Sequence, residues 1–261
     1  MRFVSFWQNP QSRRMPPYVA LALVSMQRIL GADFVLLGNK DLDAALGRDL
    51  GDKDWRFNDL EFSGCADALS IVAKSDFIRM AYVHLHGGYW FDADTVALAD
   101  PRPHLAADRC GERLHWYSEA LFGATPDNPL LATAIARCHS ADRQVWGNPG
   151  GIRDIIDVDP SQITPIPYTL LDPGFRPAYR FTTCDVMLDT VVPVETFLSN
   201  SSVALLKLYN TYFSRTPIGN MSVPEFLSSG TLLARIFLNI DPDADQWIAR
   251  CHALEQSLEE R

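Results

Sequence analysis

The chain reads KSDFIRMAYVHLHGGYWFDAD at residues 74–94, where a helical pattern passes directly into a strand pattern. The apolar residues that would share one helical face recur every three or four positions: Phe77, Ile78, Ala81, Tyr82 and Leu85. This spacing predicts a helix from Ser75 to His86 with one buried face, capped at its start by Ser75. Gly87-Gly88 would end the helix, and the aromatic run Tyr89–Phe91 predicts a buried strand that follows at once.

The segments before this stretch alternate between strand and helix patterns. Arg2–Trp7 is rich in aromatic and β-branched residues and predicts a first central strand. Pro16 and Pro17 predict the start of a helix that runs to about Leu30, and Asp33–Leu37 predicts a second strand. Because β-α-β alternation produces parallel strands, we expect an α/β fold with a mainly parallel central sheet flanked by helices. Its ligands would bind at the carboxyl ends of the strands.

After residue 94, proline and glycine interrupt the chain often, and the pattern predicts shorter elements. The predicted segments are a polar surface loop over Gly47–Asp59, a helical region opening near Cys65, a helix around Pro129–Cys138, a strand near Ile163–Pro167, and helices near Pro224–Phe237 and Gln246–Leu258. The sequence contains no internal repeat or evident linker. We therefore expect a single domain over residues 1–261, with a helical C-terminal part from about residue 222.

Charge excludes one large class of partner. The chain has 23 Lys and Arg against 32 Asp and Glu, a formal net charge of −9, which repels nucleic acid. A phosphorylated ligand would need local neutralisation by a metal ion or by a few placed cations.

The longest apolar stretch, Tyr18–Val24, is too short to predict a transmembrane segment. Five scattered cysteines favour a reducing compartment, so we expect a cytoplasmic protein, with peripheral association at the inner membrane face left open.

Four charged residues in the 74–94 stretch are candidates for chemistry. Asp92 and Asp94 stand where the predicted strand ends, and in extended chain residues two apart project to the same side. Their hard carboxylate oxygens favour Mg²⁺ or Mn²⁺, although a solvated or capping aspartate pair is the alternative. Asp76 and Arg79 are three apart and share one face of the predicted helix, where they could simply form an ion pair.

Residues 74–94 also resemble a family signature. The order Lys74-Ser75-Asp76, two apolar residues, Arg79, an apolar helix, Gly87-Gly88, three apolar residues and Asp-x-Asp is similar to that of DXD-containing, sugar-nucleotide-dependent glycosyltransferases. The nearest group is the capsular polysaccharide synthesis type, related to the yeast mannosyltransferases and the large clostridial toxins. Trp90 stands where many relatives carry tyrosine. Farther on, Asn148-Pro149-Gly150 resembles the family's Gly-Pro turn, and Lys207-Leu208-Tyr209-Asn210 resembles its C-terminal His-x-x-Asn region in altered form.

The resemblance implies a GT-A fold and a metal-dependent, retaining glycosyltransferase. It would move a sugar from a nucleotide donor, expected to be a UDP-sugar, to a glycan, glycolipid or protein acceptor, as in bacterial surface polysaccharide synthesis. By analogy, Asp92 and Asp94 bind Mn²⁺ or Mg²⁺ and the donor, Arg79 contacts the diphosphate or sugar, and Asp76 accepts sugar hydroxyls. Trp7 would stack on the nucleotide base, with a core tryptophan as the alternative. The implied catalytic residues are Asp92, Asp94 and Arg79, and transfer would occur on the face from which the phosphate departs.

Two other functions remain open at this level. Phe91-Asp92-Ala93-Asp94-Thr95-Val96 also fits the phosphatase pattern of the haloacid dehalogenase group, in which Asp92 would be the nucleophile and Asp94 the general acid. That motif normally lies on the first strand, and the pattern leaves Asp76, Arg79 and the glycine pair unexplained. The third possibility is a non-catalytic relative that binds a nucleotide sugar without transferring it.

Overall fold

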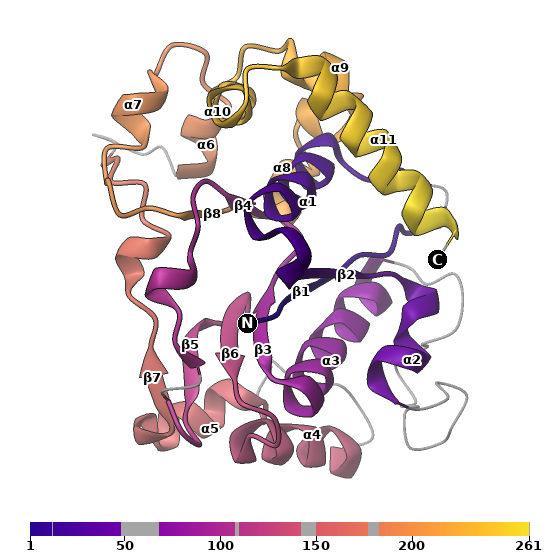
Figure 1. Ribbon diagram of the computed structural model, residues 1–261, viewed down its shortest axis with the longest axis vertical. Helices are drawn as coiled ribbons and strands as arrows, with labels where there is room; N and C mark the ends of the chain where they lie inside the picture. The colour runs from indigo at the N-terminus through magenta and orange to yellow at the C-terminus, as the bar shows by residue number, and fades with distance from the viewer. Residues whose placement is uncertain (12, 48–67, 108–109, 142–149, 177–182, 261) are drawn as a thin grey trace.

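The computed structural model describes residues 1–11, 13–47, 68–107, 110–141, 150–176 and 183–260 (Figure 1). The predicted loop over 47–59, the helix start near Cys65 and residues 148–149 of the predicted turn lie outside these ranges or at their edges. The strands are β1 (Phe3–Phe6), β2 (Phe34–Leu37), β3 (Gly88–Phe91), β4 (Thr95–Ala97), β5 (Leu114–Ser118), β6 (Leu121–Ala124), β7 (Ile163–Pro165) and β8 (Leu205–Lys207). The helices are α1 (Pro17–Leu30), α2 (Leu42–Leu46), α3 (Ala68–His86), α4 (Pro129–Ala141), α5 (Ile152–Val158), α6 (Thr183–Met187), α7 (Val194–Phe197), α8 (Asn210–Phe213), α9 (Val223–Leu227), α10 (Leu232–Ile240) and α11 (Ala244–Glu260).

Six strands form a mostly parallel central sheet in the order β2-β1-β3-β6-β5-β7. Strands β2, β1 and β3 pair in parallel, as do β5 and β7, whereas β6 runs antiparallel to both of its neighbours. The prediction of an α/β fold with a mainly parallel sheet is thus confirmed at this level, and the arrangement is consistent with a Rossmann-like fold. Strand β6 is reversed because a short hairpin, Glu119-Ala120, connects it to β5.

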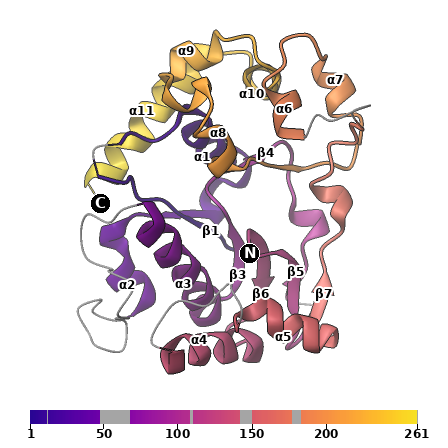
Figure 2. The same ribbon diagram turned by 180° about the vertical axis from the view of Figure 1, so that it is seen from behind.

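Helices cover both faces of the sheet, and the side chains of each strand alternate between two hydrophobic clusters. Phe3, Tyr89 and Phe91 belong to the cluster that contains α1 and the C-terminal helices. Val4 and Trp90 belong to the cluster beneath α2, α3 and α4. Figures 1 and 2 show these two layers on opposite sides of the strands. The alternation follows from the two-residue period of a strand.

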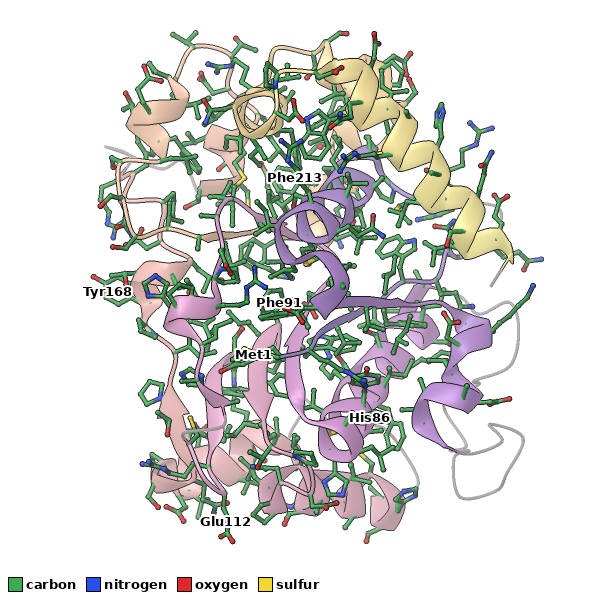
Figure 3. The ribbon with its side chains drawn as sticks, in the orientation of Figure 1. Met1, His86, Phe91, Glu112, Tyr168 and Phe213 are labelled. Atoms are coloured by element: carbon green, nitrogen blue, oxygen red, sulfur yellow. The ribbon has the colours of Figure 1, made fainter. Side chains whose placement is uncertain are left out.

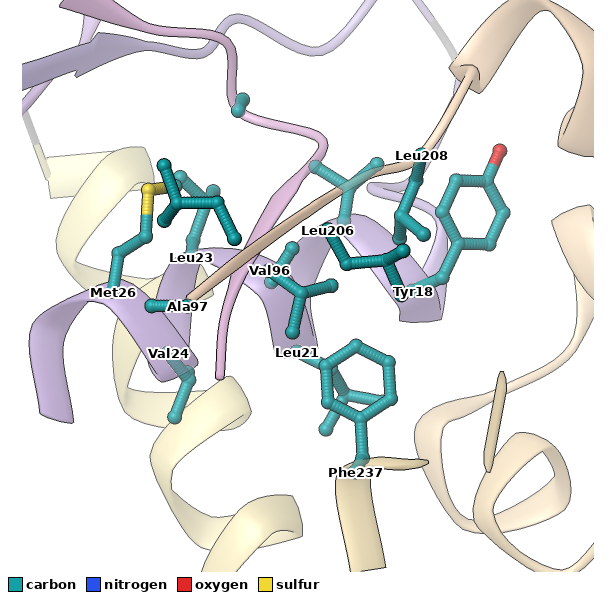
Figure 4. Packing of buried hydrophobic residues seen from close by; sticks show 14 of the residues in the cluster. Tyr18, Leu21, Leu23, Val24, Met26, Val96, Ala97, Leu206, Leu208 and Phe237 are labelled. Atoms are coloured by element: carbon teal, nitrogen blue, oxygen red, sulfur yellow. The ribbon is translucent and has the colours of Figure 1, made fainter. Parts of the chain in front are cut away.

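A second, two-stranded sheet lies on the α1 side. Strand β4 follows β3 almost directly and pairs antiparallel with β8, so that Thr95 stands opposite Lys207. The buried hydroxyl of Ser25 on α1 accepts a hydrogen bond from the backbone N–H of Ala97, which fixes β4 against the helix. Figure 4 shows Val96, Leu206 and Phe237 meeting around α1. This packing joins the C-terminal half of the chain to the end of β3.

Several local predictions were wrong, each for an identifiable reason. Among the described residues, helix α3 spans Ala68–His86, so Ser75 lies inside the helix and does not cap it. The single buried face is also wrong: all residues from Phe77 to Val83 are buried because α3 packs against the sheet and against α2 and α4, whereas Leu85 is 42% exposed. The helix expected over Pro224–Phe237 is two helices, α9 and α10. Gly230 with φ +69° separates them, and the side chain of Thr231 caps α10.

Candidate active site

A cavity lined by described residues opens at the carboxyl ends of β1 and β3 and has a volume of about 730 Å³. Strand β1 connects through α1 to β2 on one side, whereas β2 connects through α3 to β3 on the other side. The chain order therefore reverses between β1 and β3, the point at which ligands bind in open α/β sheets. Figure 3 labels Phe91, the last residue of β3 and the one directly before Asp92. The volume is in the range of small-molecule and cofactor sites.

Asp92 and Asp94 line this cavity, but their geometry differs from the extended chain that the sequence predicts. Strand β3 ends at Phe91, and the backbone N–H of Thr95 donates to the carbonyl of Asp92 at 3.0 Å, which closes a tight turn. The turn is needed because the chain leaves the main sheet here and enters β4 in the second sheet. The two carboxylates nevertheless converge, since both contact the ammonium group of Lys207.

Lys207 is the cation that the sequence did not predict at this position. Its Nζ lies 2.8 Å from Asp92 Oδ2 and also contacts Asp94 Oδ1. The side chains of Lys207, Asp92 and Asp94 are only 17%, 22% and 11% exposed. The pairing of β4 with β8 brings Lys207 opposite Thr95 and thereby beside Asp94. The one sequence signal for this residue was the resemblance of Lys207–Asn210 to a His-x-x-Asn motif in altered form.

Arg79 joins helix α3 to the end of β3 and to the β5–β6 hairpin. Its Nη2 lies 2.8 Å from Asp76 Oδ1 and 3.3 Å from Asp92 Oδ1, and its Nη1 donates to the backbone carbonyl of Glu119 at 2.7 Å. The guanidinium carbon stands 5.4 Å from the centre of the Trp90 ring, within cation–π range. Asp76 and Arg79 do form an ion pair, but the arginine is only 8% exposed, so this is not an ordinary surface pair.

Trp7 lines the cavity just after β1, and Lys74 holds the chain nearby. Trp7 packs in part against the hydrophobic cluster of α1 and donates its indole N–H to Asn9 Oδ1 at 2.7 Å. Lys74 is fully buried and donates to Gln8 Oε1 at 2.8 Å and to Asn39 Oδ1. The lysine of the signature thus ties α3 to the loops that follow β1 and β2.

A chain of two hydrogen bonds holds the carboxylate oxygen of Asp94 that Lys207 does not contact. The buried hydroxyl of Tyr18 on α1 donates to Asn210 Oδ1 at 2.7 Å, and the backbone N–H of Asn210 donates to Asp94 Oδ2 at 2.8 Å. Both oxygens of Asp94 therefore have a partner. The segment Lys207–Asn210, predicted as the altered C-terminal motif, lies in contact with the Asp-x-Asp turn.

Burial and charge act in opposite directions on this cluster. Burial is the main reason that the pKa of Asp94 lies above its ordinary value; Lys207 opposes the rise, and Asp92 adds to it. Burial also acts to raise the pKa of Asp92, but Arg79 and Lys207 outweigh it, so that this pKa lies below its ordinary value. Burial would lower the pKa of Lys207, but the two carboxylates raise it overall, and the ammonium stays protonated.

The structure thus brings together all five predicted site residues, Trp7, Asp76, Arg79, Asp92 and Asp94, at or directly behind the wall of one cavity. It adds Lys207, Asn210 and Tyr18, which the sequence patterns did not place there.

The chain matches no model of a known protein family, and a comparison with the curated proteins found none similar to it. None of the described helices combines the length and the apolar character that crossing a membrane requires.

Proposed function

We propose that the protein is a nucleotide-sugar-dependent glycosyltransferase with a GT-A type of fold. The observation that carries the proposal is the convergence of Asp92, Asp94 and Arg79 on one cavity at the β1–β3 switch point, with Asp76 paired to Arg79 behind the cavity wall. This place suits a nucleotide, and these groups match in type and order those of the DXD signature that residues 74–94 resemble. The donor class that fits best is a UDP-sugar, and the acceptor is a glycan, glycolipid or protein.

A divalent cation fits the site only in part as the side chains stand. The described residues contain no group of three or more His, Cys, Asp or Glu side chains placed to hold a metal ion. Asp92 and Asp94 supply two hard oxygen ligands, and Mg²⁺ or Mn²⁺ commonly takes its other ligands from water and from substrate phosphates. When bound, such an ion would neutralise charge on the departing diphosphate. Lys207 must first release the two carboxylates.

The remaining residues would bind and orient the donor. Trp7, at the end of β1, offers an aromatic face to the base, and the cavity beside it leads to Arg79. Arg79 lines the cavity and is fixed by Asp76, by Asp92 and by a backbone carbonyl, so it is oriented toward the diphosphate or sugar before the donor binds. Asp76 would accept hydrogen bonds from sugar hydroxyls.

The expected stereochemical outcome is retention by transfer on the leaving-group face. The carboxylates among the described cavity-lining residues are all engaged: Asp92 and Asp94 by Lys207, and Glu119 by Arg153. None therefore stands ready as a covalent nucleophile. The departing phosphate oxygen would accept the proton of the attacking hydroxyl, which needs no enzyme base.

The test is a panel of UDP- and GDP-sugars assayed for hydrolysis and transfer with Mn²⁺. We expect turnover of one donor class, and at least a roughly 100-fold loss in Asp94→Asn, because charge stabilisation of the leaving group is lost. Asp172→Asn is the matched control, since Asp172 is a carboxylate bound to Arg176 that does not line the cavity. Undiminished turnover in Asp94→Asn contradicts the proposal.

The same assay separates the alternatives. Hydrolysis of p-nitrophenyl phosphate that is lost in Asp92→Asn, with no response to sugar nucleotides, would identify a phosphatase. Binding of UDP without hydrolysis or transfer of any donor would identify a non-catalytic relative. Either result replaces the transferase assignment.

A further inference from the structure

Lys207 occupies the position between two carboxylates where a divalent cation is expected. Its ammonium contacts one oxygen of Asp92 and one of Asp94, while Asp92 Oδ1 accepts from the Trp90 indole at 2.9 Å and the backbone N–H of Asn210 holds the second oxygen of Asp94. Lys207 thus already occupies one oxygen of each aspartate, and a metal ion that bound both carboxylates would compete with it for those oxygens.

The contact between Lys207 and the aspartates has an electrostatic cause. Two carboxylates that are mostly withdrawn from water repel each other and are poorly solvated, so a counter-charge between them is strongly favoured. Lys207 supplies that charge from within the chain. The geometry is fixed from three sides, by the Asp92–Thr95 turn, by strand pairing of Thr95 with Lys207, and by Tyr18 through Asn210.

This arrangement leaves the described cavity wall without spare positive charge for a diphosphate. Arg79 is held by Asp76 and Asp92, Arg153 by Glu119, and Lys207 by Asp92 and Asp94. The positive and negative charges of the cavity wall are therefore already balanced, and a further carboxylate, Asp76, lies behind the wall. A donor would add at least two more negative charges. Some group must change its partner before the donor can be neutralised.

Lysine is suited to such a change. Its ammonium is a compact charge on a flexible four-carbon stem, without the fixed fork that holds an arginine to its partner. Lys207 lines the cavity, whereas Arg79 is bound in several directions at once. Of the two cations at the Asp-x-Asp turn, Lys207 is therefore the one that can exchange partners at low cost.

We propose that Lys207 is a displaceable internal cation: it neutralises Asp92 and Asp94 in the empty site and releases them to a divalent metal ion when its ammonium turns to the donor diphosphate. This inference rests on the proposed function for the identity of the donor. Two properties follow. The empty protein binds Mn²⁺ weakly because Lys207 competes for the same oxygens, and Mn²⁺ and UDP each strengthen binding of the other.

The first test measures Mn²⁺ binding without any donor, by the loss of the free-ion signal in electron paramagnetic resonance. Lys207→Met removes the charge and keeps the length of the stem. We expect this variant to bind Mn²⁺ at least tenfold more tightly than the unaltered protein. Arg153→Gln is the matched control, because it removes another cation of the cavity wall that pairs with Glu119, and its Mn²⁺ affinity should not change. Equal affinities in all three proteins, or no Mn²⁺ binding in any, overturn the proposal.

The second test uses the unaltered chain, so that it stands even if Lys207→Met fails to fold. Lysine acylation by acetic anhydride is followed at Lys207 by mass spectrometry of proteolytic fragments. We expect Lys207 to be protected in the empty protein, to react several-fold faster with Mn²⁺ alone at a concentration that saturates the weak site, and to be protected again with Mn²⁺ and UDP. Lys40, outside the cavity wall, reports the general reactivity. A Lys207 rate that does not respond to Mn²⁺ overturns the proposal.

Failure of the proposed function would look different from failure of this inference. Tighter Mn²⁺ binding by Lys207→Met without turnover of any sugar nucleotide would retain the role of Lys207 and reject the transferase. The opposite result is donor turnover that persists unchanged in EDTA, together with no Mn²⁺ binding by the unaltered protein or by Lys207→Met. It would retain the transferase and reject the role of Lys207.

Discussion

Replacing Arg79 with glutamine removes the cation that connects α3, the end of β3 and the β5–β6 hairpin. In the folded protein this leaves Asp76 and Asp92 without their shared guanidinium and the backbone carbonyl of Glu119 without its donor. The affected groups are largely buried, so water cannot fully replace the lost partner. We therefore expect a large loss of stability in the absence of any ligand.

The magnitude follows from burial. Removing one partner of a buried ion pair costs about 3–5 kcal/mol because the other charge stays uncompensated. Arg79 is 8% exposed, but Asp76 and Asp92 are 20% and 22% exposed, and Asp92 keeps its contact with Lys207. The expected loss of stability is therefore at the lower end of that range, about 3 kcal/mol. This corresponds to a change of roughly 150-fold in the folding equilibrium constant. Arg153→Gln should cost about 1 kcal/mol or less, since Arg153 is 59% exposed.

The assay is urea unfolding followed by far-ultraviolet circular dichroism, in EDTA and without donor. Both variants lose an arginine that touches Glu119, Arg79 at its carbonyl and Arg153 at its carboxylate, so they form a matched pair. Arg79→Lys should fall between Arg79→Gln and the unaltered protein, because it keeps the charge but not the planar fork. If Arg79→Gln loses no more stability than Arg153→Gln, the argument from buried charge is refuted.

Three further outcomes are expected. Gly88→Ala should cost at least about 3 kcal/mol in urea unfolding, because Gly88 has φ +92° and an added Cβ would lie 2.6 Å from the carbonyl oxygen of Arg2; a loss below 1 kcal/mol would contradict this. Ser25→Ala should cost about 1–3 kcal/mol in the same assay by leaving a buried β4 amide without an acceptor, and an unchanged midpoint would show that the amide finds another partner. Hydrogen bonds from the Arg176 side chain and a backbone N–H lower the pKa of Asp172 to about 2, so its contribution to stability is complete above its ordinary pKa and is lost as pH falls through about 2. Carbon NMR should give that midpoint and show it rising towards the ordinary value in Arg176→Gln, whereas equal midpoints in the two proteins would reject the assignment.

Local sequence patterns predicted the main elements because their causes are local. The periodic apolar residues of α3, the paired prolines at the start of α1 and the aromatic run of β3 each act within a few positions of the chain. Alternation of these elements then indicated a mainly parallel sheet and placed the candidate ligand site at the ends of its strands. The errors arose where a local signal was overridden by its surroundings. Ser75, for example, is a residue type that often caps a helix, but here it lies inside α3.

The chemistry of the site required contacts that local patterns do not encode. Lys207 lies more than one hundred positions from the Asp-x-Asp turn, and it meets that turn only because β8 pairs with β4. Tyr18 reaches Asp94 through Asn210 for a similar reason, since α1 packs against the second sheet. The sequence by itself determined which acidic residues follow β3. The tertiary structure alone decided which cation neutralises them, because pairing between distant strands depends on the packing of the whole core rather than on the residues next to either strand.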